Sequence, residues 1–461
     1  MLRKSILALL LLVLVVAAVP ATAQTCTASS SWVNDPTLPE SVPGNEGNHC
    51  DFAQFSWQSF LALMEPANNN QLVFESYMSW DGLFVASGSP NAWGNTPWPP
   101  TLGELTKQAG SGNDLIAQSG AEVLYDMSVN QPMYNYIVNN QLYTQNCFNN
   151  GGMNIHMPPT TDPSTGAGSI ELKTAWLPMT SCDPTKYHCV KATMQGGTPV
   201  TVGLIGIHIV HKIDDHQEWI WTSFEHVNNA PDCAKVTAPP SGYSSWNFFN
   251  SSFVPVGSAC DPCNNFGGTN CNDDNQCNTF VSETDIPNIC RTQQLMSAGC
   301  QNNGNLNDDV NDDVCLNESV WSLLPSNSVW KNYMLVGTLW FKPGMSAPVN
   351  TSTPFPPYLP GSSTTQQQEV GNTTLANTVM ETYTQMNNCF NCHQTSFATV
   401  NASTPGSGGH ADFSHIFNRI QQVGPSVSQC PTLTTSQSSH KNKESVATAP
   451  IKLKASHGNK K

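Results

Sequence analysis

The sequence predicts an α+β fold, in which a β-rich body of antiparallel hairpins is followed by a C-terminal helical segment. The clearest sign is a hairpin: residues 201–212 and 218–227 are rich in β-branched and aromatic residues, and a polar turn at residues 214–216 separates them. Apolar runs at residues 169–177 and 333–341 predict further strands. Apolar residues at helical spacing predict a helix early in the chain, a second one from about residue 374 through residue 383, and a short one after residue 411.

The composition is that of a folded chain with few charges. Of the 461 residues, 39% are hydrophobic and 11% are charged, and 18 Lys and Arg against 33 Asp and Glu give a formal net charge of −15. A disordered chain combines low hydrophobicity with a high density of net charge, so this composition argues against one. The acidic balance excludes nucleic acid as a main partner, because binding to phosphates needs a basic surface.

Residues 1–23 have the form of a secretory signal peptide. Arg3 and Lys4 precede an apolar run at residues 6–19, and small residues at Ala21 and Ala23 predict cleavage after Ala23. The run is short for a membrane span, which needs about 20 residues. The alternative is an uncleaved anchor. We therefore expect an exported mature protein without a stable membrane span.

The first helix of the mature chain is predicted at residues 51–66. Phe52, Phe60 and Leu63 fall near one stripe of this helix, and Pro66 ends it. Packing in the core is the role that such a stripe predicts.

The hairpin has a predicted register. If Lys212 pairs with Trp219, then His208 lies opposite Ser223. Gly206 inside the first strand indicates a bulge or a close approach by another part of the backbone.

Sixteen cysteines in an exported chain predict disulfides. Several of them crowd into a stretch rich in Asn, Gly and Asp, which we interpret as a disulfide-stapled insertion at about residues 255–315 in a body that spans residues 24–360. The alternative is a zinc or iron–sulfur site in that insertion. The acidic cluster at residues 308–313 is expected to be a solvated loop, with Ca²⁺ binding as the alternative.

One motif carries chemistry. Cys389 and Cys392 stand three positions apart and His393 follows directly, which is the attachment signature of c-type haem. Two thiols on one helical turn can form thioethers with the two vinyl groups, and the adjacent histidine becomes the proximal iron ligand. A redox-active disulfide is the alternative for a bare Cys-x-x-Cys pair. The single motif predicts one covalent haem c, held by a segment at residues 361–430.

The haem motif also indicates the source and compartment. Five Asn-x-Ser/Thr sequons would suit a eukaryotic secreted protein, but haem c is not attached in that pathway and chance sequons are expected in so polar a chain. We therefore expect a bacterial protein with a Sec-type signal peptide, located in the periplasm or secreted.

The sequence does not decide which residue is the sixth iron ligand. No Met follows His393, so the common downstream Met ligand is ruled out. His415 lies beside the apolar face of a predicted short helix and is the first candidate, with His410 as the second. The alternative is that both are exposed and that the ligand comes from elsewhere or is missing. Two histidine ligands would give a lower potential than a Met and a His.

Histidines on the hairpin are upstream candidates. His208, His211 and His226, with Glu225, could form a metal site or one wall of a haem pocket. A lone hairpin places them on both faces of the sheet, so we expect them instead to be hydrogen-bonded within a tryptophan-rich sheet. His226 is the best of them for a contact with haem, because a buried polar group needs a partner.

The final part of the chain has low complexity. Stretches rich in Pro, Ser, Thr and Gln at residues 346–360 and 362–369 indicate a linker to the haem segment. Residues 431–461 carry several lysines and are expected to be a disordered basic tail, with docking to an acidic partner or a membrane surface as the alternative.

The chain resembles a family of large exported bacterial cytochromes with one c-type haem, in four stretches at residues 55–63, 204–212, 219–231 and 375–383. The strand Trp-Ile-Trp-Thr-Ser-Phe-Glu-His, upstream of a C-terminal Cys-x-x-Cys-His, is the most specific feature. The resemblance covers about residues 50–420 and omits the Cys-rich insertion and the tail. It implies haem binding and electron transfer, with Cys389, Cys392 and His393 in the attachment motif, and it indicates no substrate.

Electron transfer with an unidentified redox partner protein is therefore the expected function. A body of more than 300 residues exceeds what a simple carrier requires. A haem enzyme of the peroxidase or oxygenase type, with an open distal site, is the alternative. A haem-based redox or gas sensor is a third possibility.

Overall fold

The computed structural model describes residues 25–44, 48–67, 71–85, 88–95, 98, 100–103, 114–151, 155, 157–159, 167–214, 216–251, 286–305, 308–341, 369–372, 377–385, 389, 393, 414–420 and 429–433. The predicted signal peptide, the core of the Cys-rich insertion, the linker, Cys392, His410 and nearly all of the basic tail lie outside these residues.

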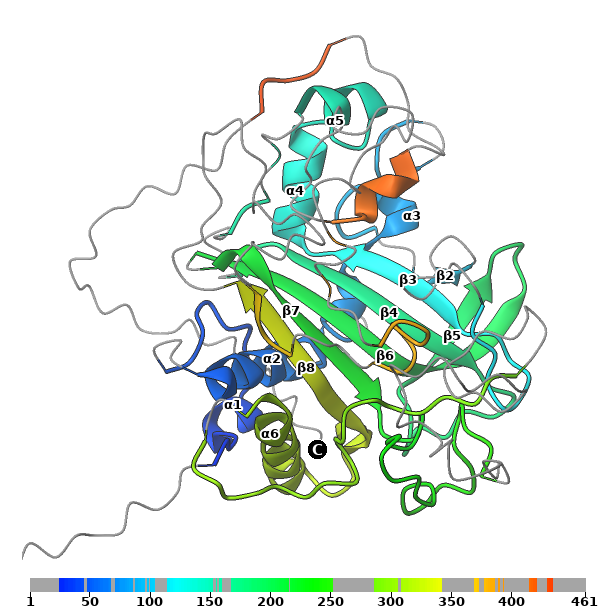
Figure 1. Cartoon of the computed structure of the whole chain (residues 1–461). Helices are drawn as coiled ribbons and strands as arrows, with labels where there is room; N and C mark the ends of the chain where they lie inside the picture. Colours follow the sequence, from blue (N-terminus) through cyan, green and yellow to red (C-terminus); the bar gives the residue numbers. More distant parts are fainter. Residues whose placement is uncertain are drawn as a thin grey trace, which may run out of the picture.

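The described residues form a mixed α/β fold around one nine-stranded sheet (Figure 1). The main path runs β1-β3-β4-β6-β7-β8-β9, with β5 beside β6 and β2 beside β5. Every pairing is antiparallel except β2 with β5. The strands are β1 (Met78–Ser79), β2 (Thr101–Leu102), β3 (Leu124–Val129), β4 (Ile170–Pro178), β5 (Cys189–Met194), β6 (Pro199–Ile213), β7 (His216–His226), β8 (Tyr333–Phe341) and β9 (Glu369–Gly371). The prediction of a body of antiparallel hairpins is confirmed at this level.

The central hairpin has the predicted register. His208 pairs with Ser223, and the register shifts after His211 at the turn. A second irregularity interrupts the pairing of β4 with β6 close to Gly206. A Cβ atom on Gly206 would lie 2.6 Å from Val379 Cγ2, so the glycine permits the close approach of a side chain rather than of the backbone.

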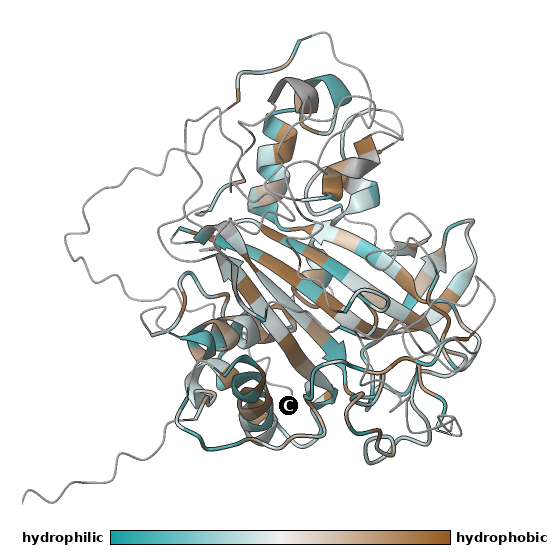
Figure 2. Cartoon of the chain, viewed as in Figure 1, coloured by the Kyte–Doolittle hydropathy of each residue, from teal (hydrophilic) through white to brown (hydrophobic). Residues whose placement is uncertain are grey.

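Helix α2 (His49–Leu63) covers one face of the sheet, which we call the α2 face. The Asn48 side chain accepts a hydrogen bond from the backbone N–H of Asp51 and begins the helix. Ser56 shares hydrogen bonds with Thr222 of β7 and Thr338 of β8, so the helix crosses the middle of the sheet. Apolar residues recur along these strands (Figure 2), and the buried Phe60 stacks on Phe224 with ring centroids 4.3 Å apart.

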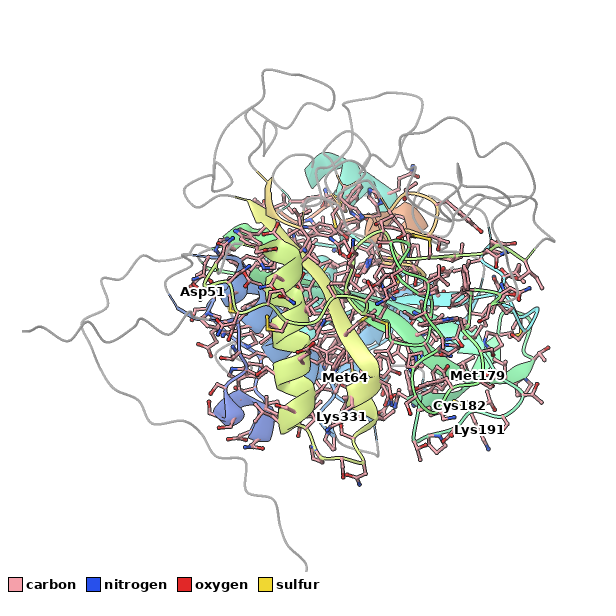
Figure 3. The ribbon with its side chains drawn as sticks, turned by 60° about the horizontal axis from the view of Figure 1, so that its bottom comes forward. Asp51, Met64, Met179, Cys182, Lys191 and Lys331 are labelled. Carbon is pink, nitrogen blue, oxygen red and sulfur yellow. A yellow bond between two sulfur atoms is a disulfide. The ribbon has the colours of Figure 1, made fainter. Side chains whose placement is uncertain are left out.

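The other helices form two groups. Helices α1 (Ser30–Asn34) and α6 (Asp309–Leu323) accompany α2, and α6 runs beside β8, as Figure 3 shows from below. Helices α3 (Trp80–Leu83), α4 (Gln131–Asn139) and α5 (Gln145–Gly151) gather at the other end of the sheet with the 3₁₀ helix η5 (Ile416–Arg419) (Figure 1). The remaining 3₁₀ turns are η2 (Phe74–Ser76) and η4 (Val329–Asn332).

Two local predictions are wrong. Residues 377–385 form a series of turns rather than a helix. The Asn377 side chain accepts hydrogen bonds from the N–H groups of Val379 and Met380, as at a helix N-terminus, but no regular helix follows among the described residues. The acidic cluster is not a solvated loop: Asp308 caps α6, and Asp312 and Asp313 are buried in its first turns.

The buried aspartates of α6 have a distant partner. His49 of α2 lies 3.7 Å from Asp312 and 3.9 Å from Asp313, measured between nitrogen and oxygen. Burial acts to lower the pKa of His49, but these aspartates outweigh it and raise the pKa to about 9. The cluster thus joins two helices.

Five disulfides connect the described residues: Cys26–Cys50, Cys147–Cys430, Cys182–Cys189, Cys233–Cys290 and Cys300–Cys315. Such density is typical of proteins that fold in an oxidising compartment. Among the described residues, no helix is long and apolar enough to cross a membrane.

Candidate haem-binding site

Cys389 and His393 of the predicted haem motif lie one helical turn apart. The backbone N–H of His393 donates to the carbonyl oxygen of Cys389 over 2.8 Å, which is the i to i−4 bond of an α-helix. Residues four apart in a helix share one face, so the Cys389 thiol and the His393 imidazole project to the same side. This is the arrangement that attachment and ligation of one haem require.

His393 and His415 lie face to face. Their ring centroids are 4.1 Å apart and the ring planes differ by 15°. The indole of Trp221, from β7, contacts His393 with ring centroids 4.5 Å apart. The first candidate for the sixth ligand is thus next to the proximal histidine.

A transverse row of strand residues forms the floor beneath this segment. Val129, Glu171, Val210, Trp221 and Leu339 pair across β3, β4, β6, β7 and β8 in that order. Paired neighbours project to the same face of a sheet, and this is the face opposite α2. Apart from Glu171, these residues belong to one apolar cluster, and Cys389 packs against it.

Aromatic contacts and a disulfide fix the segment that carries His415. Phe417 stacks on Phe148 of α5 with centroids 4.6 Å apart, and Ile416 is fully buried. Each fully buried side chain of this size contributes about 1.5–3 kcal/mol. Cys430 then joins Cys147 of α5, so the segment is covalently tied to the helices at this end of the sheet.

Glu171 is the one carboxylate in the floor, and it contacts this segment. Its side chain is 6% exposed, and the hydroxyl of Ser414 donates to its Oε2 atom. Burial raises the pKa of Glu171 to about 7, while the hydrogen bond from Ser414 acts in the opposite direction.

A polar layer adjoins the floor on the same face, where residues 377–385 cover the sheet. His208 Nε2 lies 3.2 Å from Glu381 Oε1. Burial lowers the pKa of Lys173 to about 8, although Glu381 opposes the shift. We call this side of the sheet the 377–385 face.

A buried ion network anchors residues 377–385. Arg291 is fully buried and forms ion pairs with Glu225 of β7 and with Asp232. Glu225 also accepts hydrogen bonds from the backbone N–H and the hydroxyl of Thr378. The carboxylate on the hairpin therefore holds the chain that leads to Cys389.

His226 lies away from these residues. Its Nε2 atom donates to the carbonyl oxygen of Lys186 over 2.9 Å, and its Nδ1 atom accepts from the backbone N–H of Asn228 over 3.1 Å. Its ring stacks on Tyr187 with centroids 4.1 Å apart. Burial lowers the pKa of His226 to about 3, so the ring is neutral. The structure therefore gives His226 a hydrogen-bonded role in the body of the protein, away from Cys389 and His393.

The hairpin histidines do not converge on a metal site. His208 faces residues 377–385, whereas His211 lies beneath α2, with its Nδ1 atom 3.4 Å from Ser59 Oγ. Among the described residues, no group of three or more His, Cys, Asp or Glu side chains is arranged to hold a metal ion.

The residues present suit haem c in their chemistry. A thiol and an imidazole on one helical turn, a second imidazole and an apolar wall are the groups that such a site needs. The two histidine rings are in contact, so both can ligate one iron only after they separate and turn their nitrogens inward.

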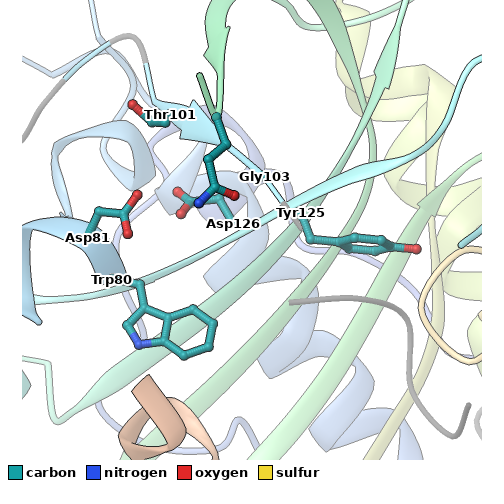
Figure 4. A pocket seen from close by; sticks show the side chains of 7 residues that line it. Trp80, Asp81, Thr101, Gly103, Tyr125 and Asp126 are labelled. Atoms are coloured by element: carbon teal, nitrogen blue, oxygen red, sulfur yellow. The ribbon is translucent and has the colours of Figure 1, made fainter. Parts of the chain in front are cut away.

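A surface pocket lies beside the site, with about 380 Å³ of empty space. Asp81 and Asp126 direct their carboxylates toward each other in it, above Trp80 (Figure 4). Burial, and then the charge of Asp81, raise the pKa of Asp126 to about 8. Trp80 belongs to the same apolar cluster as Phe417.

None of the protein-family models, characterised proteins or solved structures compared with this chain matches it. The resemblance to large exported cytochromes with one haem therefore stays a prediction from the motifs.

Sequence reasoning missed Glu171, Trp221 and Ser414 as parts of this site. Trp221 belongs to the Trp-Ile-Trp strand, whose sequence was the most specific part of the resemblance to exported cytochromes and could have indicated it. The alternation of Glu171 and Lys173 with apolar residues is typical of a solvated strand face, and it gave no sign that a distant segment covers that face.

Proposed function

We propose that this protein is an exported bacterial cytochrome that carries one covalent haem c and transfers electrons. Cys389 and Cys392 would form the thioethers, His393 would be the proximal ligand and His415 the sixth ligand. The observation that carries the proposal is the face-to-face contact of His393 and His415 beside Trp221.

Each residue of the site has a role in this proposal. When bound, haem c supplies an iron that gains and loses one electron. The two cysteines would hold the group covalently, and His393 and His415 would both ligate the iron, which would leave no position on the metal for a substrate. Val210, Leu339 and their neighbours exclude water from one side of the site.

Export is supported by the disulfides. Five of them among the described residues suit an oxidising compartment, where haem c is also attached. We propose the bacterial periplasm or the external medium as the location, and a redox protein as the partner that exchanges electrons with the haem.

The test is covalent attachment in a bacterial host that matures c-type cytochromes. The full chain, denatured and analysed by intact-mass spectrometry, should carry the mass of one haem after cleavage of its leader. The double variant Cys389→Ser/Cys392→Ser should lose that mass. A matched control, Cys182→Ser/Cys189→Ser, removes a disulfide elsewhere on the sheet and should keep it.

A wild-type chain without haem, expressed where a reference cytochrome is matured, would contradict the proposal. A chain with haem but an open sixth position would favour the haem enzyme instead.

A further inference from the structure

Ser414 connects the segment of the proposed sixth ligand to the sheet. Its hydroxyl donates to Glu171 Oε2, and its oxygen accepts the backbone N–H of Ile416 over 3.1 Å. The Ser414 side chain therefore bonds to Ile416 on the other side of His415 and to Glu171 of the sheet. Its own backbone, at φ −88° and ψ 3°, precedes η5.

Glu171 is an unusual residue for its position. Its neighbours across the sheet are Val129 and Val210, both of which belong to the apolar cluster. A carboxylate is costly to bury unless hydrogen bonds compensate it. An aliphatic side chain would pack here as well as Glu171 does. The carboxylate must therefore do something that packing does not require, which is to accept the hydrogen bond from Ser414.

The other anchors of the segment do not set the position of His415 in the same way. Phe417 and the Cys147–Cys430 bridge hold the chain on its C-terminal side. On the N-terminal side, the Ser414 hydrogen bond is the anchor that the described residues show. Without it, the residue before His415 would be free to leave the sheet.

We propose that Glu171 is a positioning residue for the sixth ligand: through Ser414 it holds His415 where its imidazole can reach the iron opposite His393. The inference rests on the proposed function, because it assumes a haem at Cys389 and His393. The motif places the site in the C-terminal segment alone. The inference adds Glu171, a residue of the β-rich body, to that site.

The experiment measures how much ferrous iron binds carbon monoxide in the full-length protein with haem attached. Glu171→Leu removes the acceptor and should raise the carbon-monoxide-binding fraction about tenfold or more, because the hydrogen bond that holds Ser414 on the sheet is lost. Glu171→Gln keeps an acceptor for Ser414 and should behave like the wild type. Ser414→Ala should shift the fraction in the same direction as Glu171→Leu.

Glu75 provides the matched control. It is equally buried, at 4% exposed, and makes its hydrogen bonds to Leu72 and His188 instead. Glu75→Leu should leave the carbon-monoxide-binding fraction unchanged, although it costs stability.

The outcomes separate this inference from the proposed function. Haem retained in Glu171→Leu and Ser414→Ala, with carbon monoxide binding as in the wild type, would overturn the positioning role and leave the cytochrome intact. If Glu171→Leu fails to fold, Ser414→Ala decides by the same readout. Absence of covalent haem from the wild type would overturn both.

Discussion

On one face of the central sheet a regular helix, α2, buries Phe55 and Phe60, whereas the opposite face is covered by residues 377–385, which form only turns. The helix is held mainly by apolar packing. The turns are held by a carboxylate, Glu225, and by the arginine that neutralises it. Both coverings are buried, but they depend on different forces.

The difference matters for function, because the proposed haem motif follows the irregular covering. Polar anchors such as the bond between Thr378 and Glu225 have strict geometry, whereas apolar packing tolerates small shifts. A chain that must present Cys389 and His393 at a fixed place gains accuracy from such anchors. We therefore expect substitutions in the ion network to lower the unfolding free energy and to loosen the 377–385 face. Substitutions that remove apolar contacts on the α2 face should have smaller effects.

The largest effect on stability is expected at Arg291. Arg291→Met leaves Glu225 and Asp232 buried without their cation, which costs about 3–5 kcal/mol of unfolding free energy. Lys186→Met breaks a partly exposed pair with Asp183 and should cost under about 1 kcal/mol. Chemical denaturation of both variants measures the difference, and equal losses would remove the basis of the comparison.

A smaller effect is expected at Gly206. In Gly206→Ala the new methyl group would overlap with Val379, at a cost of about 1–3 kcal/mol, and should loosen residues 377–385. Gly203→Ala is the control in the same strand, since its methyl group would meet its nearest neighbours, Met179 and Tyr187 Cβ, at 3.1 and 3.2 Å, which requires smaller shifts than the 2.6 Å contact at Gly206. Hydrogen exchange should show faster exchange at residues 378–385 in the first variant alone. The same exchange in both variants would refute the close contact.

On the α2 face, Phe60→Leu should be milder still. It keeps an apolar side chain but loses the stacking on Phe224 and the edge contact with Trp57, at a cost of about 0.5–1.5 kcal/mol. Exchange at residues 378–385 should stay as in the wild type. Loosening of that segment by Phe60→Leu would show that the two faces are not independent.

Acid should weaken the α2 face through His211. Burial lowers the pKa of this histidine from 6.5 to about 3. Between these values the unfolded chain binds a proton that the folded chain does not, so stability is full above pH 6.5 and falls as the pH drops toward 3. The contribution is about 1.4 kcal/mol per pH unit.

His226 has the same shift and adds an equal slope. Unfolding free energies at pH 7, 6 and 5 should therefore show a shallower slope for His226→Gln than for the wild type. An unchanged slope would mean that His226 is protonated in the folded protein.

The sequence was sufficient for the elements whose pattern is local. Helix α2, strand β8 and the β6–β7 register with His208 opposite Ser223 follow from periodicity and turn chemistry. The apolar face predicted beside His415 also lies in the core, at Ile416 and Phe417.

The remaining features depend on contacts between distant parts of the chain. Asp313 is buried because His49 lies beside it, and Glu171 because Ser414 covers it. Residues 377–385 had helical spacing, but the backbone N–H of Thr378 donates to Glu225 of β7 and the side chain of Gln385 donates to the carbonyl oxygen of Cys290, so contacts with distant residues fix this segment. No periodic pattern encodes such partners.

The central claim is that His393 and His415 close both sides of one haem iron. The most direct measurement is the absorption spectrum of the purified full-length protein, reduced with dithionite, before and after addition of carbon monoxide. We predict a low-spin spectrum that carbon monoxide leaves unchanged, and a carbon-monoxide-sensitive spectrum in His415→Ala. A wild-type spectrum that shifts with carbon monoxide would contradict the claim and indicate an open site for peroxidase or oxygenase chemistry.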